Sequence, residues 1–145
     1  MNNSSNLTTV NAYRAVMTSV FLGFVCTFLS LLYNLFYRLG GIDFSNDLIN
    51  VAYIIFGEMF LFFLIGFIYL GLRLITAKGD LLFILLFVAL TIYFLFAISA
   101  GEFAARPAEN LRFRGMLHGL TILIGITTLF IPFCYRSAAF QRNVV

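Results

Sequence analysis

The chain has 145 residues, of which 62% are hydrophobic and only 10% are charged. With a mean hydropathy of +1.02, this composition excludes a soluble globular domain and indicates an integral membrane protein. The formal net charge of +3 comes from basic residues that flank the apolar runs. We therefore expect the lipid bilayer, and no nucleic acid, as the partner of these charges.

The chain begins with a predicted mobile polar tail, residues 1–14, because Asn, Ser and Thr cannot bury enough surface to fold alone. The first predicted span, residues 15–37, is uncharged between Arg14 and Arg38. Small and weakly polar residues recur in it every three or four positions, which places them on one helical face. They are Ser19, Gly23, Thr27, Ser30 and Asn34. This face is predicted to pack against neighbouring helices.

The second predicted span, residues 48–72, contains one ionisable group, Glu58, two residues from its midpoint. As a helix it is about 37 Å long and crosses a hydrocarbon core of about 30 Å. A carboxyl at that depth is costly unless it is protonated, paired or hydrated, so it indicates a functional site. Two interpretations stay open: a carboxylate that binds a proton or cation, or a permanently protonated side chain that donates a hydrogen bond to Thr27 or Ser30.

Helix-capping, turn and charged residues set the predicted bounds of the remaining spans. The sequence Ser45-Asn46-Asp47 predicts an N-cap for the second span, and residues 73–80 predict a tight turn. The third predicted span is residues 81–101. A polar loop follows it, in which Pro107 is placed to open a helix.

The fourth predicted span, residues 115–135, contains Pro132, which should bend or end its helix. A short basic tail, residues 136–145, ends the chain. The prediction is therefore an all-α integral membrane protein, an antiparallel four-helix bundle that forms one membrane domain from residue 15 to residue 135. Both termini lie on one side, and the Lys and Arg count, five against four, favours the cytoplasm for that side.

Depth along each span suggests which side chains meet. Measured from the first and third loops at about 1.5 Å per residue, Glu58 lies about 16 Å deep. The other candidates for a proton or cation site at or above that depth are His118, Thr27, Ser30, Asn34, Tyr93 and Thr121. The predicted rim charges are Glu102, Arg106, Arg112 and Arg114. His118 either relays protons with Glu58 or is a hydrogen-bonded interfacial group.

Cofactor and catalytic chemistry find little support. The single histidine excludes bis-His haem ligation within one chain, while a haem shared with a partner or a second copy, or a quinone site, stays open as a third alternative. No spacing of ligand residues predicts a metal site. No motif activates a Ser or Cys as a nucleophile. We expect no cofactor, no metal and no enzymatic activity.

Two short motifs give a resemblance. The four-span layout has a fourth span that opens Met116-Leu117-His118 and closes Ile131-Pro132. It resembles small four-span bacterial membrane proteins of unknown function. The resemblance adds only to the four-helix prediction, and it implies no activity. We expect the protein in a bacterial inner membrane.

Two functions are predicted from these features. One is a small proton- or cation-linked transporter or channel component that uses the intramembrane Glu58. The other is a structural or assembly subunit of a larger membrane complex. The protein would act either as a homo-oligomer or within that larger complex.

Overall fold

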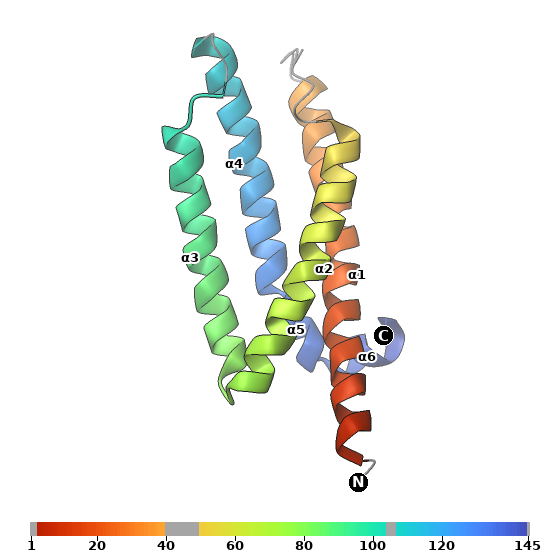
Figure 1. The fold of residues 1–145 in the computed structure, drawn as a ribbon. Helices are drawn as coiled ribbons and strands as arrows, with labels where there is room; N and C mark the ends of the chain where they lie inside the picture. The colour runs from red at the N-terminus through yellow and green to blue at the C-terminus, as the bar shows by residue number, and fades with distance from the viewer. Residues whose placement is uncertain (1–2, 40–49, 104–106, 145) are drawn as a thin grey trace.

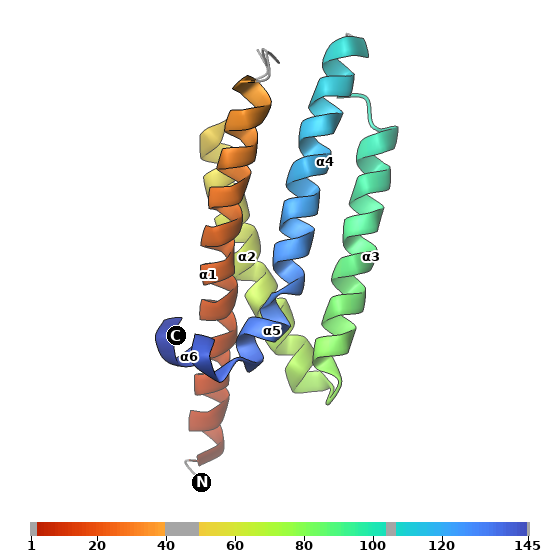
Figure 2. The same ribbon diagram turned by 180° about the vertical axis from the view of Figure 1, so that it is seen from behind.

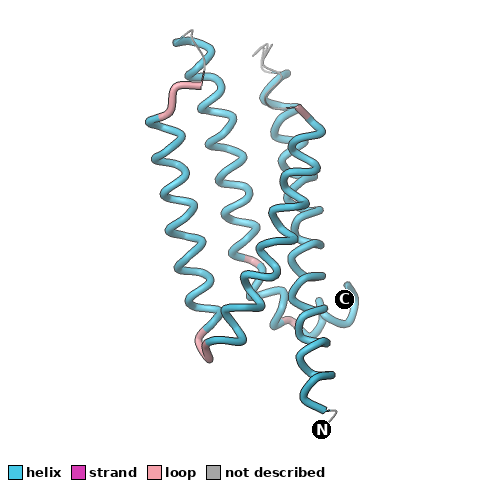
Figure 3. The backbone as a smooth tube through the Cα atoms, in the orientation of Figure 1, coloured by secondary structure: helices cyan, strands magenta, loops and turns pink. Residues whose placement is uncertain are grey.

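The computed structural model describes residues 3–39, 50–103 and 107–144. In these ranges every regular element is a helix (Figures 1 and 3). The helices are α1 (Asn3–Leu39), α2 (Val51–Ile75), α3 (Gly79–Ala100), α4 (Pro107–Leu129), α5 (Ile131–Arg136) and α6 (Ala138–Val144). Four stretches are long and apolar enough to cross a membrane: Val10–Leu39, Val51–Ile75, Gly79–Ala100 and Pro107–Arg136. The predicted all-α, four-helix membrane fold is confirmed.

The long helices form two antiparallel pairs. Helices α1 and α2 lie side by side, and α3 runs beside α4 (Figures 1 and 2). Helices α2 and α3 are joined by the short turn at Thr76–Lys78, where the sequence predicts a tight connection. Both termini lie toward the end of the bundle that holds this turn (Figure 1), as an even number of spans requires.

The contact between α1 and α2 uses the predicted stripe of small residues. All five stripe residues are buried, and Ser19 and Ser30 are fully so. A Cβ atom on Gly23 would lie 2.8 Å from the Cβ of Phe62, and one on Gly66 would lie 3.1 Å from the Cα of Val16. Because these two glycines lack side chains, the backbones approach closely. The prediction for this face is confirmed.

Helix α4 packs against the other end of α1 through two tyrosines. The hydroxyl of Tyr33 donates to the carbonyl of Gly115 at 3.1 Å, and that of Tyr37 donates to the carbonyl of Arg112 at 2.7 Å. A side chain at Gly119 would collide with the ring of Tyr33. The N-terminal part of α4 is therefore bound to α1, and α4 also packs beside α3.

The two terminal segments differ from the prediction. Helix α1 begins at Asn3, within the segment predicted as an irregular tail, and residues 138–144 form α6. Extending an existing helix costs little because each added residue gains a backbone hydrogen bond. Helix α6 also packs on α1: Gln141 Nε2 donates to Thr18 Oγ1 at 3.0 Å, and the ring of Phe140 meets that of Phe21 edge-on at 5.3 Å.

The prolines act as the sequence predicts. Pro107 is the first residue of α4, where no backbone N–H is required. Pro132 lies in the first turn of α5, and α4 ends just before it, at Leu129. The predicted Ser45-Asn46-Asp47 cap lies outside the described residues, and the observed cap of α2 is Asn50, whose side chain accepts from the N–H of Ala52 at 3.4 Å.

Candidate functional site

Glu58 lies on the face of α2 that packs against α1, and it is 5% exposed. Its carboxyl lies near the side chains of Cys26, Thr27 and Ser30. Cys26 also lies near Thr127 of α4. These five residues, the Glu58 cluster, join three helices in the interior of the bundle. The structure thus brings together Glu58, Thr27 and Ser30 of the predicted site.

The Glu58 cluster contains polar atoms whose hydrogen bonds the protein does not satisfy. Glu58 Oε2, Thr27 Oγ1 and Ser30 Oγ are all buried and have no hydrogen-bond partner among the described residues. Such a buried atom costs about 1–3 kcal/mol and therefore requires an explanation. Because all three oxygens are inaccessible to solvent, the cluster has room for a proton on the carboxyl but shows no space for a hydrated ion.

Asn34 continues the polar stripe from the cluster to the end of α1. It is 2% exposed, and its Oδ1 accepts from Nε of Arg38 at 2.9 Å. Ser30, Asn34 and Arg38 are spaced four residues apart on α1, so they lie one above another on the same face. This line of polar groups connects the buried carboxyl to the end of the helix.

His118 does not join this cluster. Its Nδ1 lies 2.6 Å from the carbonyl oxygen of Arg114, and its Nε2 lies 3.0 Å from Oγ of Ser99. A carbonyl only accepts, so Nδ1 carries a proton. The contact with Ser99 ties α4 to α3, and no described contact joins His118 to Glu58. The structure supports the interfacial interpretation of His118 and gives no support to a direct relay with Glu58.

Two further candidates lie apart from the Glu58 cluster. Tyr93 is 65% exposed on α3, with its ring 5.7 Å from that of Phe94, so its placement in the site is corrected. Thr121 lines a cavity between α2, α3 and α4, which does not include Glu58. The depth estimates did not include the rotation of each helix about its axis, which decides whether a side chain faces the cluster.

The predicted rim charges have separate environments. They are Glu102, Arg106, Arg112 and Arg114. Glu102 and Arg112 are exposed, and Arg106 lies outside the described residues. Arg114 donates from Nε and Nη2 to the carbonyl of Gly101, at 2.8 and 2.5 Å. This side chain satisfies a carbonyl at the end of α3 and so acts as a cap.

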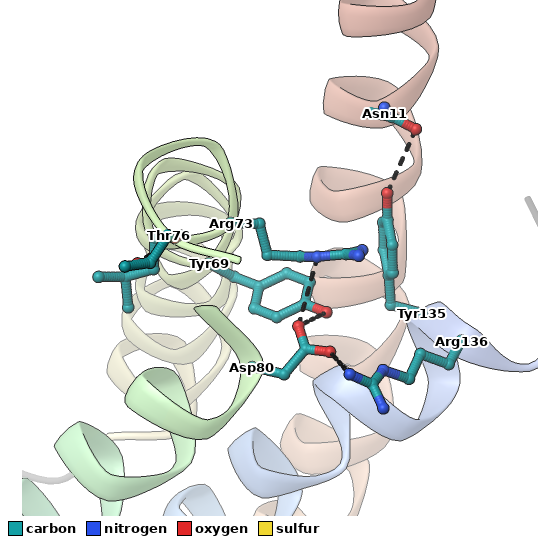
Figure 4. A network of polar contacts seen from close by, with 8 residues as sticks. Asn11, Tyr69, Arg73, Thr76, Asp80, Tyr135 and Arg136 are labelled. Carbon is teal, nitrogen blue, oxygen red and sulfur yellow. Dashed lines mark hydrogen bonds and ion pairs between the residues drawn. The ribbon is translucent and has the colours of Figure 1, made fainter. Parts of the chain in front are cut away.

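A second buried carboxylate, which the sequence analysis treated only as part of a turn, lies at the opposite end of the bundle (Figure 4). Oδ1 of Asp80 lies 3.3 Å from Nε of Arg73 and accepts from the hydroxyl of Tyr69 at 2.9 Å. Its Oδ2 pairs with Nη2 of Arg136. We call Tyr69, Arg73, Asp80, Tyr135 and Arg136 the Asp80 cluster. The sequence did contain one indication of this cluster, the opposite charges of Arg73 and Asp80 at the two ends of the predicted turn.

Aromatic rings hold the Asp80 cluster in place. The guanidinium of Arg73 lies 4.5 Å from the centre of the Tyr135 ring, a cation–π distance. The rings of Tyr69 and Tyr135 meet edge-on at 5.4 Å, and the hydroxyl of Tyr135 donates to Asn11 at 3.4 Å (Figure 4). The cluster thus fastens α1, α2, α3 and α5 together near the α2–α3 turn.

These features define a multi-pass, all-α integral membrane protein with two buried carboxyl groups: Asp80 pairs with two arginines, and Glu58 has no ion pair among the described residues. Among the described residues, no group of three or more His, Cys, Asp or Glu side chains is placed to hold a metal ion. Comparison with protein-family models, curated proteins and solved structures finds no match to this chain. The resemblance to small four-span bacterial proteins stays a prediction.

Proposed function

We propose that this protein is a small proton-linked transporter or channel component in which Glu58 binds and releases the proton. The observation that carries the proposal is the buried Oε2 of Glu58, which has no hydrogen-bond partner among the described residues. Glu58 lies in the first third of the span Val51–Ile75, and a carboxyl inside a membrane span is by default a hypothesis for a functional site. One with an unsatisfied oxygen gains more than a satisfied one from binding a small donor.

The hydroxyls beside Glu58 support this interpretation over a purely structural one. Thr27 and Ser30 lie near the Glu58 carboxyl, but among the described residues neither hydroxyl makes a hydrogen bond of good geometry, as a structural, protonated carboxyl would require. Elsewhere on α1 the Ser19 hydroxyl donates to the carbonyl of Ala15 at 3.1 Å. Helix α1 therefore satisfies an isolated hydroxyl by itself, and the two beside Glu58 stay available.

The chemistry of the ligands favours a proton over a metal cation. Hard cations such as Ca²⁺ and Mg²⁺ take six or more oxygen ligands, often with several carboxylates or free carbonyls. The Glu58 cluster supplies one carboxyl, two available hydroxyls and the thiol of Cys26. Backbone carbonyls in the middle of α1 and α2 are engaged in helical hydrogen bonds. A proton needs only the carboxyl and a neighbouring acceptor.

Access from the end of α1 that carries Arg38 is part of the proposal. Asn34 lies between Ser30 and Arg38 on that side. On the other side of Glu58, Phe62 and Ile65 are 0% and 2% exposed and pack in the apolar core. A proton would therefore enter along the polar face, and a change in helix packing would be needed for release through the core.

The membrane and its orientation belong to the same proposal. We place the protein in a bacterial inner membrane with both termini in the cytoplasm. The end with the termini contains five of the nine basic residues, and the cytoplasmic side of a membrane protein is usually the more basic. Cysteine-specific labelling of a Ser137→Cys variant from either side of sealed vesicles tests the orientation. The variant is made in a protein whose Cys26 and Cys134 are replaced by Ala, and that cysteine-free protein without Ser137→Cys is the control.

The alternative function is an assembly subunit. It rests on helix α3, of whose most apolar window only 11% is buried within this chain, against 44% for α1, which leaves a face for lipid or for a partner helix. A partner helix would cover that face. Under this alternative, neither the wild-type protein nor Glu58→Gln carries a proton flux. The wild-type protein in lipid nanodiscs would then have a native mass greater than that of one chain.

Proton binding is tested by infrared difference spectroscopy in lipid. The protonated carboxyl band should appear on acidification and vanish on alkalinisation, and Glu58→Gln should lack it. Ser30→Ala should shift this band, whereas the matched control Ser19→Ala should not, since the Ser19 hydroxyl is bonded to Ala15. In proteoliposomes with an internal pH dye, Glu58→Gln should abolish proton flux. A Glu58 band that stays constant over the pH range of the folded protein contradicts the proposal.

A further inference from the structure

Two arginines share one carboxylate at the end of the bundle that holds the α2–α3 turn. Nε of Arg73 lies 3.3 Å from Oδ1 of Asp80, and Nη2 of Arg136 pairs with Oδ2 of the same group (Figure 4). Because both oxygens belong to a single carboxylate, the two guanidinium groups lie close together. Two positive charges thus face one negative charge, which leaves one positive charge unbalanced.

The rest of this end of the bundle does not balance that charge. Among the described residues, Asp80 is the only acidic side chain here. The other described acids are Glu58, inside the bundle, and Glu102 and Glu109, at the opposite end (Figure 1). Further basic side chains at the same end are all exposed: Arg14, Lys78 and Arg142. An anion from outside the chain would therefore bind here with favourable electrostatics.

Both guanidinium groups keep donors that the chain does not use. A guanidinium has five N–H donors in one plane. Arg73 uses Nε on Asp80 and Arg136 uses Nη2, and neither makes another hydrogen bond or ion pair among the described residues. The two side chains are 37% and 69% exposed. A group outside the chain is therefore able to reach the remaining N–H groups.

Aromatic rings fix the orientation of Arg73. Its guanidinium carbon lies 4.5 Å from the centre of the Tyr135 ring and 5.9 Å from that of the Tyr69 ring. The two rings also meet edge-on at 5.4 Å. A side chain that is already held in place loses less conformational freedom when it binds a ligand. The arginine pair is therefore preorganised.

The pair lies at the level where the apolar stretches end. On this side of the membrane their limits are Val10, Ile75, Gly79 and Arg136. The lipid headgroups, with their phosphates, begin where the hydrocarbon core ends. Arginine binds phosphate through parallel N–H···O bonds, and one phosphate has enough oxygens to accept from two guanidinium groups.

We propose that Arg73 and Arg136 together bind one phosphate group at the membrane surface, with Asp80 positioning both guanidinium groups. An anionic lipid headgroup and a dissolved phosphate ester present this same chemistry, and the experiment separates the two sources. The site uses the Asp80 cluster and not Glu58, so the inference stands independently of proton transport.

Native mass spectrometry of the full chain in a zwitterionic detergent tests the proposal with three probes. They are dioleoyl phosphatidylglycerol, dioleoyl phosphatidylcholine and glycerol phosphate. One phosphatidylglycerol should bind about tenfold more tightly than phosphatidylcholine, whose choline neutralises its own phosphate; this factor corresponds to about 1.4 kcal/mol. Glycerol phosphate that displaces the bound lipid identifies a dissolved ester as a ligand of the site. Lipid that stays bound in its presence identifies the headgroup as the source.

Matched variants separate this site from general surface charge. Arg73→Gln and Arg136→Gln should each weaken phosphatidylglycerol binding about tenfold, the loss expected for one charge-assisted hydrogen bond. Arg14→Gln and Arg142→Gln remove the same charge from exposed positions at the same end, and they should change binding by less than about twofold. Arg136→Lys keeps a positive charge opposite Asp80 but loses the planar set of donors, so it should still weaken binding about threefold.

Two outcomes overturn the inference. Equal affinity for the two lipids, unchanged in Arg136→Gln and Arg136→Lys, means that the arginines serve only to hold Asp80. Equal weakening in Arg142→Gln and Arg136→Gln means that the lipid responds to the overall basic charge of this end and not to the arginine pair.

Discussion

Two buried carboxylates on neighbouring helices have opposite surroundings. Asp80 is 9% exposed, and it pairs with Arg73 and Arg136 and accepts from the hydroxyl of Tyr69, although its Oδ2, like Oε2 of Glu58, makes no hydrogen bond of good geometry. Glu58 is 5% exposed, yet its Oε2 has no hydrogen-bond partner among the described residues. Burial alone therefore does not assign a role to an acid in a membrane protein. The ion pairs and hydrogen bonds that a buried carboxyl makes distinguish a structural group from one that is available for function.

The comparison is tested most strongly by Asp80→Asn. This change keeps the size of the side chain and leaves Arg73 and Arg136 without their counter-charge. Removing one partner of a fully buried pair costs about 3–5 kcal/mol. Because the two arginine side chains are 37% and 69% exposed, solvent screening reduces the expected loss to about 2 kcal/mol. Reversible unfolding in mixed detergent and SDS micelles measures it.

The control for Asp80→Asn is Glu102→Gln, which removes a negative charge from an exposed position. Its free energy of unfolding should stay within about 0.5 kcal/mol of the wild-type value. Equal losses in both variants would mean that the Asp80 ion pairs contribute nothing specific.

A double variant sharpens the assignment of the ion pair. Arg136→Gln alone should cost about 1 kcal/mol, because the arginine is largely exposed. Combined with Asp80→Asn, it should cost less than the sum of the two single changes, by about 0.5–1 kcal/mol, because the two side chains interact. The same unfolding assay on all four proteins gives this coupling. Strict additivity would show that Arg136 does not stabilise Asp80.

Tyr69→Phe should have a smaller effect. The hydroxyl donates to Asp80 from a fully buried ring, and loss of one such hydrogen bond costs about 1 kcal/mol. The matched control is Tyr135→Phe, whose hydroxyl makes an exposed bond of 3.4 Å to Asn11. The control should change the free energy of unfolding by less than about 0.5 kcal/mol. Equal effects would mean that the Tyr69 bond has no special weight.

The sequence predicted the features that depend on local pattern. The length of the apolar runs predicted the four spans, and Pro132 predicted the break between α4 and α5. The spacing of the small residues predicted the packed face of α1; these residues are Ser19, Gly23, Thr27, Ser30 and Asn34. These rest on helical periodicity and backbone chemistry. They were enough to place Thr27 and Ser30 beside Glu58.

Features that depend on how helices rotate and tilt were not predictable in this way. Depth estimates grouped Tyr93 and His118 with Glu58, yet one faces outward and the other pairs with Ser99. The turn sequence indicated only the pair of Arg73 and Asp80, whereas Tyr69 and Arg136 reach Asp80 through the packing of three helices. Crossing angles are set by packing of whole helix faces, which a single sequence does not reveal.

The smallest change in stability is expected for Glu58→Gln, although the chemical change is the same as in Asp80→Asn. Oε2 has no partner to lose, and the new amide finds acceptors in the hydroxyls of Thr27 and Ser30. The free energy of unfolding should therefore stay within about 0.5 kcal/mol of the wild-type value. A loss as large as that of Asp80→Asn would make Glu58 a structural hydrogen-bonding group. The proposed proton binding would then lose its main support, because a carboxyl already committed to holding helices together has no free oxygen with which to exchange protons.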